Sequence, residues 1–249
     1  MKKYCLQFAI FIFTCTAVSG EIKNGYEKNI LQMKRSLSEL SAILIETTEL
    51  SPTQRHKIEY SIEALVNHIS GYELTENLLN QFRAIAPALS NEIDTIKDRK
   101  GRPVDVYVKF VPTDATEIKA CGTTYIAHAE NDPDTYNSEY GEFTVSVKIW
   151  IVSNALTILS HELGHVKYLV PNLASYIDFH KNHYNSYTDH SNYFGHNSRD
   201  QSGKSAFLYE RLFKKEYANF MKISGEKIPN PLLLIAKIKK NLNHNRMIL

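Results

Sequence analysis

The segment His161-Glu162-Leu163-Gly164-His165 constrains this chain more than any other, because it repeats the H-E-x-x-H pattern. Residues four apart on a helix lie one turn apart on the same face, so His161 and His165 can present imidazole nitrogens to one zinc ion. Glu162 is turned from His161 by roughly 100 degrees. It is therefore expected to reach a water molecule beside the metal and to accept its proton. The pattern predicts a helix here that carries a metal centre.

The residues around this segment supply the context that the pattern needs. The stretch 142–152 alternates apolar and polar residues, as a half-buried strand does, and two further strand candidates are 104–111 and 123–129. Ser153 then serves as a predicted N-cap, and Pro171 is expected to end the helix. Four apolar residues predict its buried face: Leu156, Leu159, Leu163 and Val166. Gly164 costs about 1 kcal/mol relative to alanine inside a helix, which indicates close packing there.

The N-terminal part is predicted to be helical from residue 26 to 98. Apolar residues from Ile30 to Leu44 recur at helical spacing and predict a first helix. The segment 51–54, Ser-Pro-Thr-Gln, predicts the start of a second helix, and Gly71 its end. A third helix is expected from Thr75, kinked at Pro87. We interpret these helices as part of a core, with a removable pro-segment as the alternative.

The first twenty residues have the pattern of a secretory signal peptide. A positive start, Met1-Lys2-Lys3, precedes an apolar run from Cys5 to Val18 and then small residues. The run is too short to span a bilayer comfortably. We therefore expect an exported chain, secreted or periplasmic, without stable membrane insertion after cleavage; an uncleaved anchor and a lipoprotein attached through Cys15 are the less favoured alternatives. Cys121 is then left without an intrachain disulfide partner, and we interpret it as a small buried residue.

The composition excludes some classes of function. Hydrophobic residues make up 43% and charged residues 22%, as in an ordinary globular protein. The net charge of +2 provides no basic field of the kind that nucleic-acid binding needs. A chain of 249 residues can bury a substantial core. We therefore expect a globular protein with no nucleic-acid partner.

Residues 142–215 resemble the active-site region of zincin metallopeptidases, through the five-residue motif and the order of strand and helix around it. Metzincins continue the motif with a glycine and a third histidine, and this chain has Tyr168 and Pro171 at those positions. The chain is more similar to gluzincins, in which the third zinc ligand is a glutamate on a second helix packed against the first. The resemblance implies a zinc-dependent peptidase that acts on a peptide or protein substrate.

A second helix that could carry the third ligand is expected within 195–220, with Asp200 or Ser202 as its cap. Glu210 lies there among apolar neighbours, one turn beyond Ala206. A small residue such as Ala206 would admit close packing of two helices. Glu210 is therefore the favoured third ligand.

Alternatives to this assignment stay open. Glu210 could be an exposed charge paired with Lys214 four residues later, and His196 in the preceding turn could be the metal ligand. Glu216 lies in a lysine-rich stretch and is interpreted as solvated. An oxyanion-stabilising donor is expected among the tyrosines and histidines of 180–193, but the sequence does not single one out.

These observations predict an α+β protein with a signal peptide over 1–20, a helical N-terminal region over 21–100 and a zincin-like domain over 101–249. The predicted function is peptide hydrolysis by an exported enzyme that binds Zn²⁺ and uses Glu162 as general base. One alternative is a secreted zinc-binding or scaffold protein with the same fold and no turnover, against which an intact Glu162 argues. The other is a helical interaction protein that works through residues 26–98.

Overall fold

The structure is a computed structural model that describes residues 20–98, 101–111, 122–128, 143–150, 153–172 and 201–248. Nearly all of the predicted signal peptide lies outside these residues, as do Cys121, His196 and the segment 180–193, and the predictions on them stay predictions. The described helices are α1 (Ile30–Glu46), α2 (Pro52–Ile85), α3 (Pro87–Asp94), α4 (Ala155–Leu169), α7 (Gln201–Ser224) and α8 (Pro231–Ile248). The described strands are β1 (Ile22–Asn24), β2 (Val106–Val111), β3 (Gly122–His128) and β4 (Phe143–Trp150).

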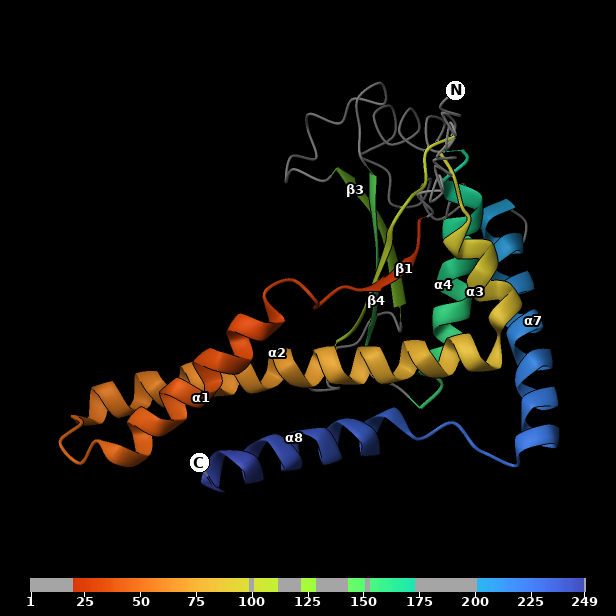
Figure 1. Cartoon of the computed structure of the whole chain (residues 1–249). Coiled ribbons are helices and arrows are strands. Elements are labelled where there is room, and N and C mark those ends of the chain that lie inside the picture. Colours follow the sequence, from red (N-terminus) through yellow and green to blue (C-terminus); the bar gives the residue numbers. More distant parts are fainter. Residues whose placement is uncertain are drawn as a thin grey trace, which may run out of the picture.

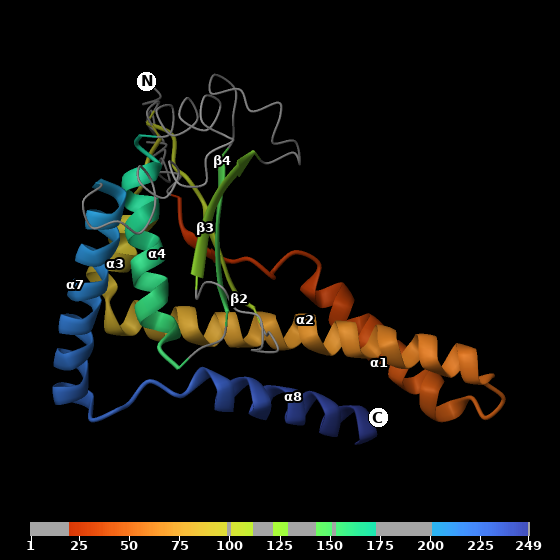
Figure 2. The same cartoon turned by 180° about the vertical axis from the view of Figure 1, so that it is seen from behind.

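The strands form one mixed sheet in the order β1-β2-β4-β3. Strands β1, β2 and β4 are parallel, and β3 pairs antiparallel with β4 at the edge. Alternate residues of β2 are buried, as the alternating pattern predicted for this stretch. Helix α4 packs against β3 and β4, and α7 packs against α4, so the helices stand beside the sheet (Figures 1 and 2).

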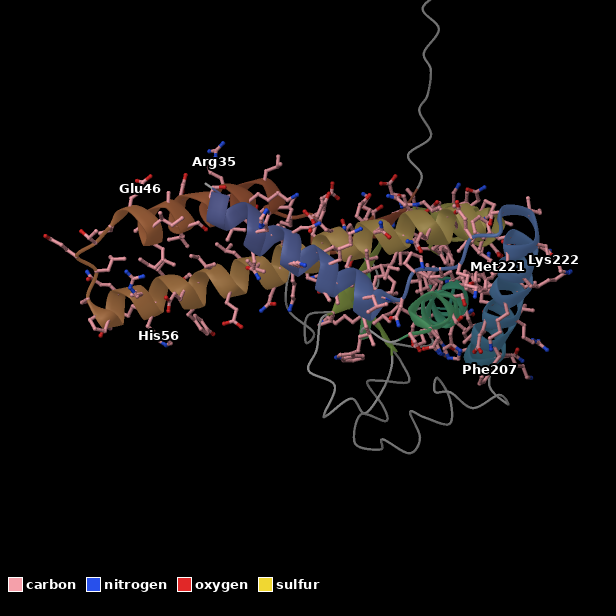
Figure 3. All side chains as sticks on the ribbon, turned by 90° about the horizontal axis from the view of Figure 1, so that it is seen from below. Arg35, Glu46, His56, Phe207, Met221 and Lys222 are labelled. Carbon is pink, nitrogen blue, oxygen red and sulfur yellow. The ribbon has the colours of Figure 1, made fainter. Side chains whose placement is uncertain are left out.

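Helices α1 and α2 form a hairpin that extends away from the sheet (Figure 1). We call α1 together with residues 52–70 of α2 the helical arm. The start of α2 is set locally, because Ser51 and Gln54 form a complete capping box on either side of Pro52. Apolar residues fill the space inside the arm: Ile30, Leu37, Ile62, Val66 and Ile69. Polar side chains such as Arg35, Glu46 and His56 point outward from it (Figure 3).

Two predicted features of the N-terminal helices are wrong. Helix α2 continues through Gly71 to Ile85, without an end at Gly71 or a new start at Thr75. A Cβ added at Gly71 would lie 2.8 Å from the ring carbon Cζ of Tyr26, so the glycine makes room for this ring. Pro87 does not kink a helix but opens α3 after a break at Ala86.

One apolar core joins the N-terminal region to the sheet. It includes residues of α2 and α3, the buried side of β2 and β4, and the inner face of α4. Strand β1 lies in the N-terminal region, which was expected to be helical only. It pairs with β2, which lies beyond the predicted domain boundary near residue 100. The α+β class is confirmed, whereas the domain boundary near residue 100 stays a prediction.

The last helix, α8, was not predicted, although Pro231 stands at its first position and Asn230 accepts a hydrogen bond from the amide of Leu232. It returns along α2, with Leu242 packed against the core of the arm (Figures 1 and 3). None of the described helices is long and apolar enough to cross a membrane.

Candidate metal centre

The H-E-x-x-H segment lies on a helix, α4, which follows strand β4 as the pattern predicted. The four apolar residues expected on its inner face are all buried: Leu156, Leu159, Leu163 and Val166. The predicted cap is wrong, because α4 starts one residue later with Asn154 as N-cap and without a side-chain capping bond. The helix ends at Leu169, two residues before Pro171.

Helix geometry brings the two histidines together. The ring centres of His161 and His165 are 5.0 Å apart, with the rings nearly perpendicular at 76°. His165 is buried, with 5% of its surface exposed, and the side chain of His161 is 13% exposed. Two imidazoles bound to one tetrahedral zinc at about 2.0–2.1 Å would have ring centres roughly 5 Å apart. The spacing of the rings is therefore compatible with a shared ion.

Glu210 approaches this pair from the neighbouring helix α7. Its Oε2 atom lies 3.3 Å from Nδ1 of His161, and its Oε1 atom lies 2.5 Å from Nζ of Lys214. Partial burial raises the pKa of the Glu210 carboxyl, but Lys214 and His161 together outweigh this effect, so the pKa lies below its usual value. A carboxylate held in the charged form suits a cation. One carboxylate oxygen of Glu210 contacts Lys214 while the other approaches His161.

The close approach of α4 and α7 depends on small residues. A Cβ added at Gly164 would lie 2.6 Å from Cα of Ala206 and 2.7 Å from the carbonyl oxygen of Ser205. In addition, the Ser205 hydroxyl donates a hydrogen bond of 2.7 Å to the carbonyl oxygen of Gly164. The backbones therefore meet where Gly164 and Ala206 were expected to allow it, and Glu210 lies one turn further along α7.

Glu162 is buried on the sheet side of α4, with 3% of its surface exposed. A Cβ added at Gly122, the first residue of the edge strand β3, would lie 2.7 Å from Oε1 of Glu162 and 3.0 Å from its Cγ. The carboxylate thus lies against the backbone of the edge strand.

Ser202 is a residue of this site that the sequence reasoning misassigned. It was expected, as the alternative to Asp200, to cap α7, but it lies inside the first turn, fully buried, with Oγ 2.7 Å from Nδ1 of His165. Asp200 lies outside the described residues. Ser202, Ala206 and Glu210 follow one another at intervals of four and so occupy one face of α7. This spacing was a readable signal, because the same face was already expected to carry the third ligand.

Phe207 and Glu216, also on α7, differ in their relation to the site. Phe207 makes an edge contact with His161, with ring centres 5.2 Å apart. Glu216, interpreted as solvated, is half-buried, and burial raises the pKa of its carboxyl. Glu216 lies more than one turn beyond Glu210 on the same helix.

The donor chemistry of these residues fits zinc, which is commonly bound by two histidines and a carboxylate. Two donors on one tetrahedral zinc are roughly 3.3 Å apart, and His161 Nδ1 and Glu210 Oε2 are separated by 3.3 Å. Over the described ranges, however, no group of three or more His, Cys, Asp or Glu side chains is gathered closely enough to hold a metal ion. The fit therefore rests on the donor types and on the two pairwise spacings.

No family model, no curated protein and no solved structure matches this chain. Functional assignment therefore depends on the chemistry and geometry of its own residues.

Proposed function

We propose that this protein is an exported zinc-dependent peptidase with a zincin-like active site. The observation that carries the proposal is the approach of Glu210 on α7 to His161 on α4, one helical turn from His165. These three residues would hold the ion. His196 remains the rival third ligand, and the predicted signal peptide supports export.

When bound, zinc would polarise the scissile carbonyl and lower the pKa of a water molecule in the site. Glu162 accepts the proton of the attacking water at its carboxylate and later delivers a proton to the leaving amine. Its burial beside β3 excludes bulk water and limits the orientations that the carboxylate can take. Removing such a general base typically lowers the rate by about 10²–10⁴-fold.

The edge position of β3 supports a peptide as the substrate. Strand β3 pairs with β4 on one side and is last in the strand order, and its first residue touches the Glu162 side chain. An extended peptide can pair with a sheet edge through main-chain hydrogen bonds. Such pairing would bring a peptide bond of the substrate close to the general base.

The test compares the purified mature chain with its Glu162→Gln form on a mixed peptide library. We expect both forms to contain one zinc per chain and only the wild type to cleave. Equal cleavage by the two forms would reject Glu162 as general base. Zinc binding without cleavage by either form would support the alternative, a non-catalytic zinc-binding protein. Absence of a stoichiometric divalent metal from the wild type would reject both.

A further inference from the structure

Ser202 forms a contact between α7 and α4 that packing alone does not require. Its Oγ lies 2.7 Å from Nδ1 of His165, and both residues are buried, with 0% and 5% of their surfaces exposed. Placing a hydroxyl and an imidazole nitrogen in the interior costs free energy unless they satisfy each other. The pair therefore forms a hydrogen bond, and the position of the proton in it decides which ring nitrogen of His165 keeps a lone pair.

A neutral imidazole carries one N–H and one lone pair, and a metal binds only the nitrogen with the lone pair. Because Nδ1 of His165 is within hydrogen-bond distance of Ser202, the nitrogen that can be offered to an ion is Nε2. This requires the proton to be on Nδ1 and the serine oxygen to accept it. The opposite tautomer would place the proton on Nε2 and block ligation.

We propose that Ser202 is a positioning residue that selects the Nδ1–H tautomer of His165 and fixes the orientation of its ring for metal binding. The proposal rests on the proposed function, since it assigns Ser202 a role in the same site. Hydrogen-bond partners of this kind orient a ligating histidine, and losing one typically lowers metal affinity by about 10–100-fold.

The chain offers a matched control in Ser205, one turn along the same helix. Its hydroxyl also bonds across to α4 at 2.7 Å, but its partner is the backbone carbonyl of Gly164. Ser205→Ala therefore removes a hydroxyl and one inter-helix hydrogen bond without touching a ligand. A purely structural effect of serine removal should appear in both variants.

The experiment records long-range ¹H–¹⁵N correlations of the histidine rings in the metal-free mature chain, well above the ordinary histidine pKa. We expect His165 to be the Nδ1–H tautomer in the wild type and in Ser205→Ala. Ser202→Ala should shift the ring toward the Nε2–H tautomer. Ser202→Thr, which keeps a hydroxyl, should restore the wild-type tautomer.

The second measurement is zinc affinity, by competition with a chelator. We expect Ser202→Ala to bind zinc about 10–100-fold more weakly than the wild type, and Ser205→Ala to bind like the wild type. An Nε2–H tautomer in the wild type overturns the proposal, and so does a Ser202→Ala protein with unchanged tautomer and affinity. If the wild type binds no zinc, the proposed function fails, while the tautomer in the metal-free protein still decides the role of Ser202. If Ser202→Ala does not fold, the wild-type tautomer alone decides it.

Discussion

The α4–α7 helix pair and the helical arm are both built from long amphipathic helices, but they use buried polar groups differently. In the arm, the buried hydroxyls bond within their own helix, Ser41 to the carbonyl oxygen of Leu37 and Ser70 to that of Val66. Between α4 and α7, polar groups bond across the interface, as Ser202 does with His165. The two buried hydroxyls of the arm are therefore satisfied within their own helices, and the core of the arm packs through apolar contacts.

This difference indicates where the chemistry of the molecule lies. A buried charge or imidazole is expensive unless it is paired, so packing alone gives no reason to place Glu162 and His165 in the interior. Perturbed and buried polar groups concentrate at functional sites. Among its described residues, the arm has no buried charge and no buried imidazole: its buried polar side chains are those of Ser41 and Ser70, and the rest of its interior is apolar. Mutations in the two regions should separate metal binding from stability.

The largest effect is expected at Glu210. Glu210→Ala should lower zinc affinity by about 100-fold or more, equivalent to about 3 kcal/mol, because even an outer hydrogen-bond partner is worth 10–100-fold. The measurement is zinc competition with a chelator. Glu216→Ala on the same helix is the control and should bind zinc like the wild type. If instead His196→Ala loses zinc and Glu210→Ala keeps it, His196 takes the role of third ligand.

A smaller effect is expected at the crossing of the two helices. Gly164→Ala would gain up to about 1 kcal/mol in helix propensity. However, the new Cβ would lie 2.6 Å from Cα of Ala206, and overpacking against backbone costs about 1–3 kcal/mol. We expect a net loss in the free energy of unfolding, measured in urea, together with weaker zinc binding as the proposed ligands on α4 and α7 separate.

Gly71→Ala is the counterpart of this change beside the arm. Its Cβ would meet the ring of Tyr26 at 2.8 Å, a side chain far from the histidines in sequence. Stability should fall while zinc affinity stays at the wild-type value.

A Gly164→Ala protein that is more stable than the wild type would contradict the close approach of α4 and α7.

The smallest effect is expected at the start of α2. Ser51→Ala removes the hydroxyl that accepts the amide hydrogen of Gln54 and should cost about 1 kcal/mol in the free energy of unfolding. Zinc affinity and any peptide cleavage should not change, because the capping box touches only the arm. A parallel loss of zinc would show that the arm and the site are coupled, and that the two regions are less distinct than their hydrogen bonds indicate.

Features that depend on near neighbours in the chain could be predicted from the sequence. The capping box at Ser51, the strand alternation of β2 and the helix that carries His161 and His165 all depend on residues within a few positions of one another. The small residues Gly164 and Ala206 also indicated a close helix contact, and the backbones do meet there. Local conformational preference and helical periodicity are enough for such inferences.

Features that depend on distant parts of the chain could not be predicted in this way. Gly71 is a residue type that often ends a helix, yet α2 continues through it, and its missing side chain leaves room for the ring of Tyr26, 45 positions earlier in the chain. Strand β1 is too short to be recognised alone and exists through its pairing with β2. Serine is a residue type that often caps a helix, but the hydroxyl of Ser202 lies within hydrogen-bond distance of His165, 37 residues away. In each case a long-range contact outweighs a local preference of about 1 kcal/mol or less.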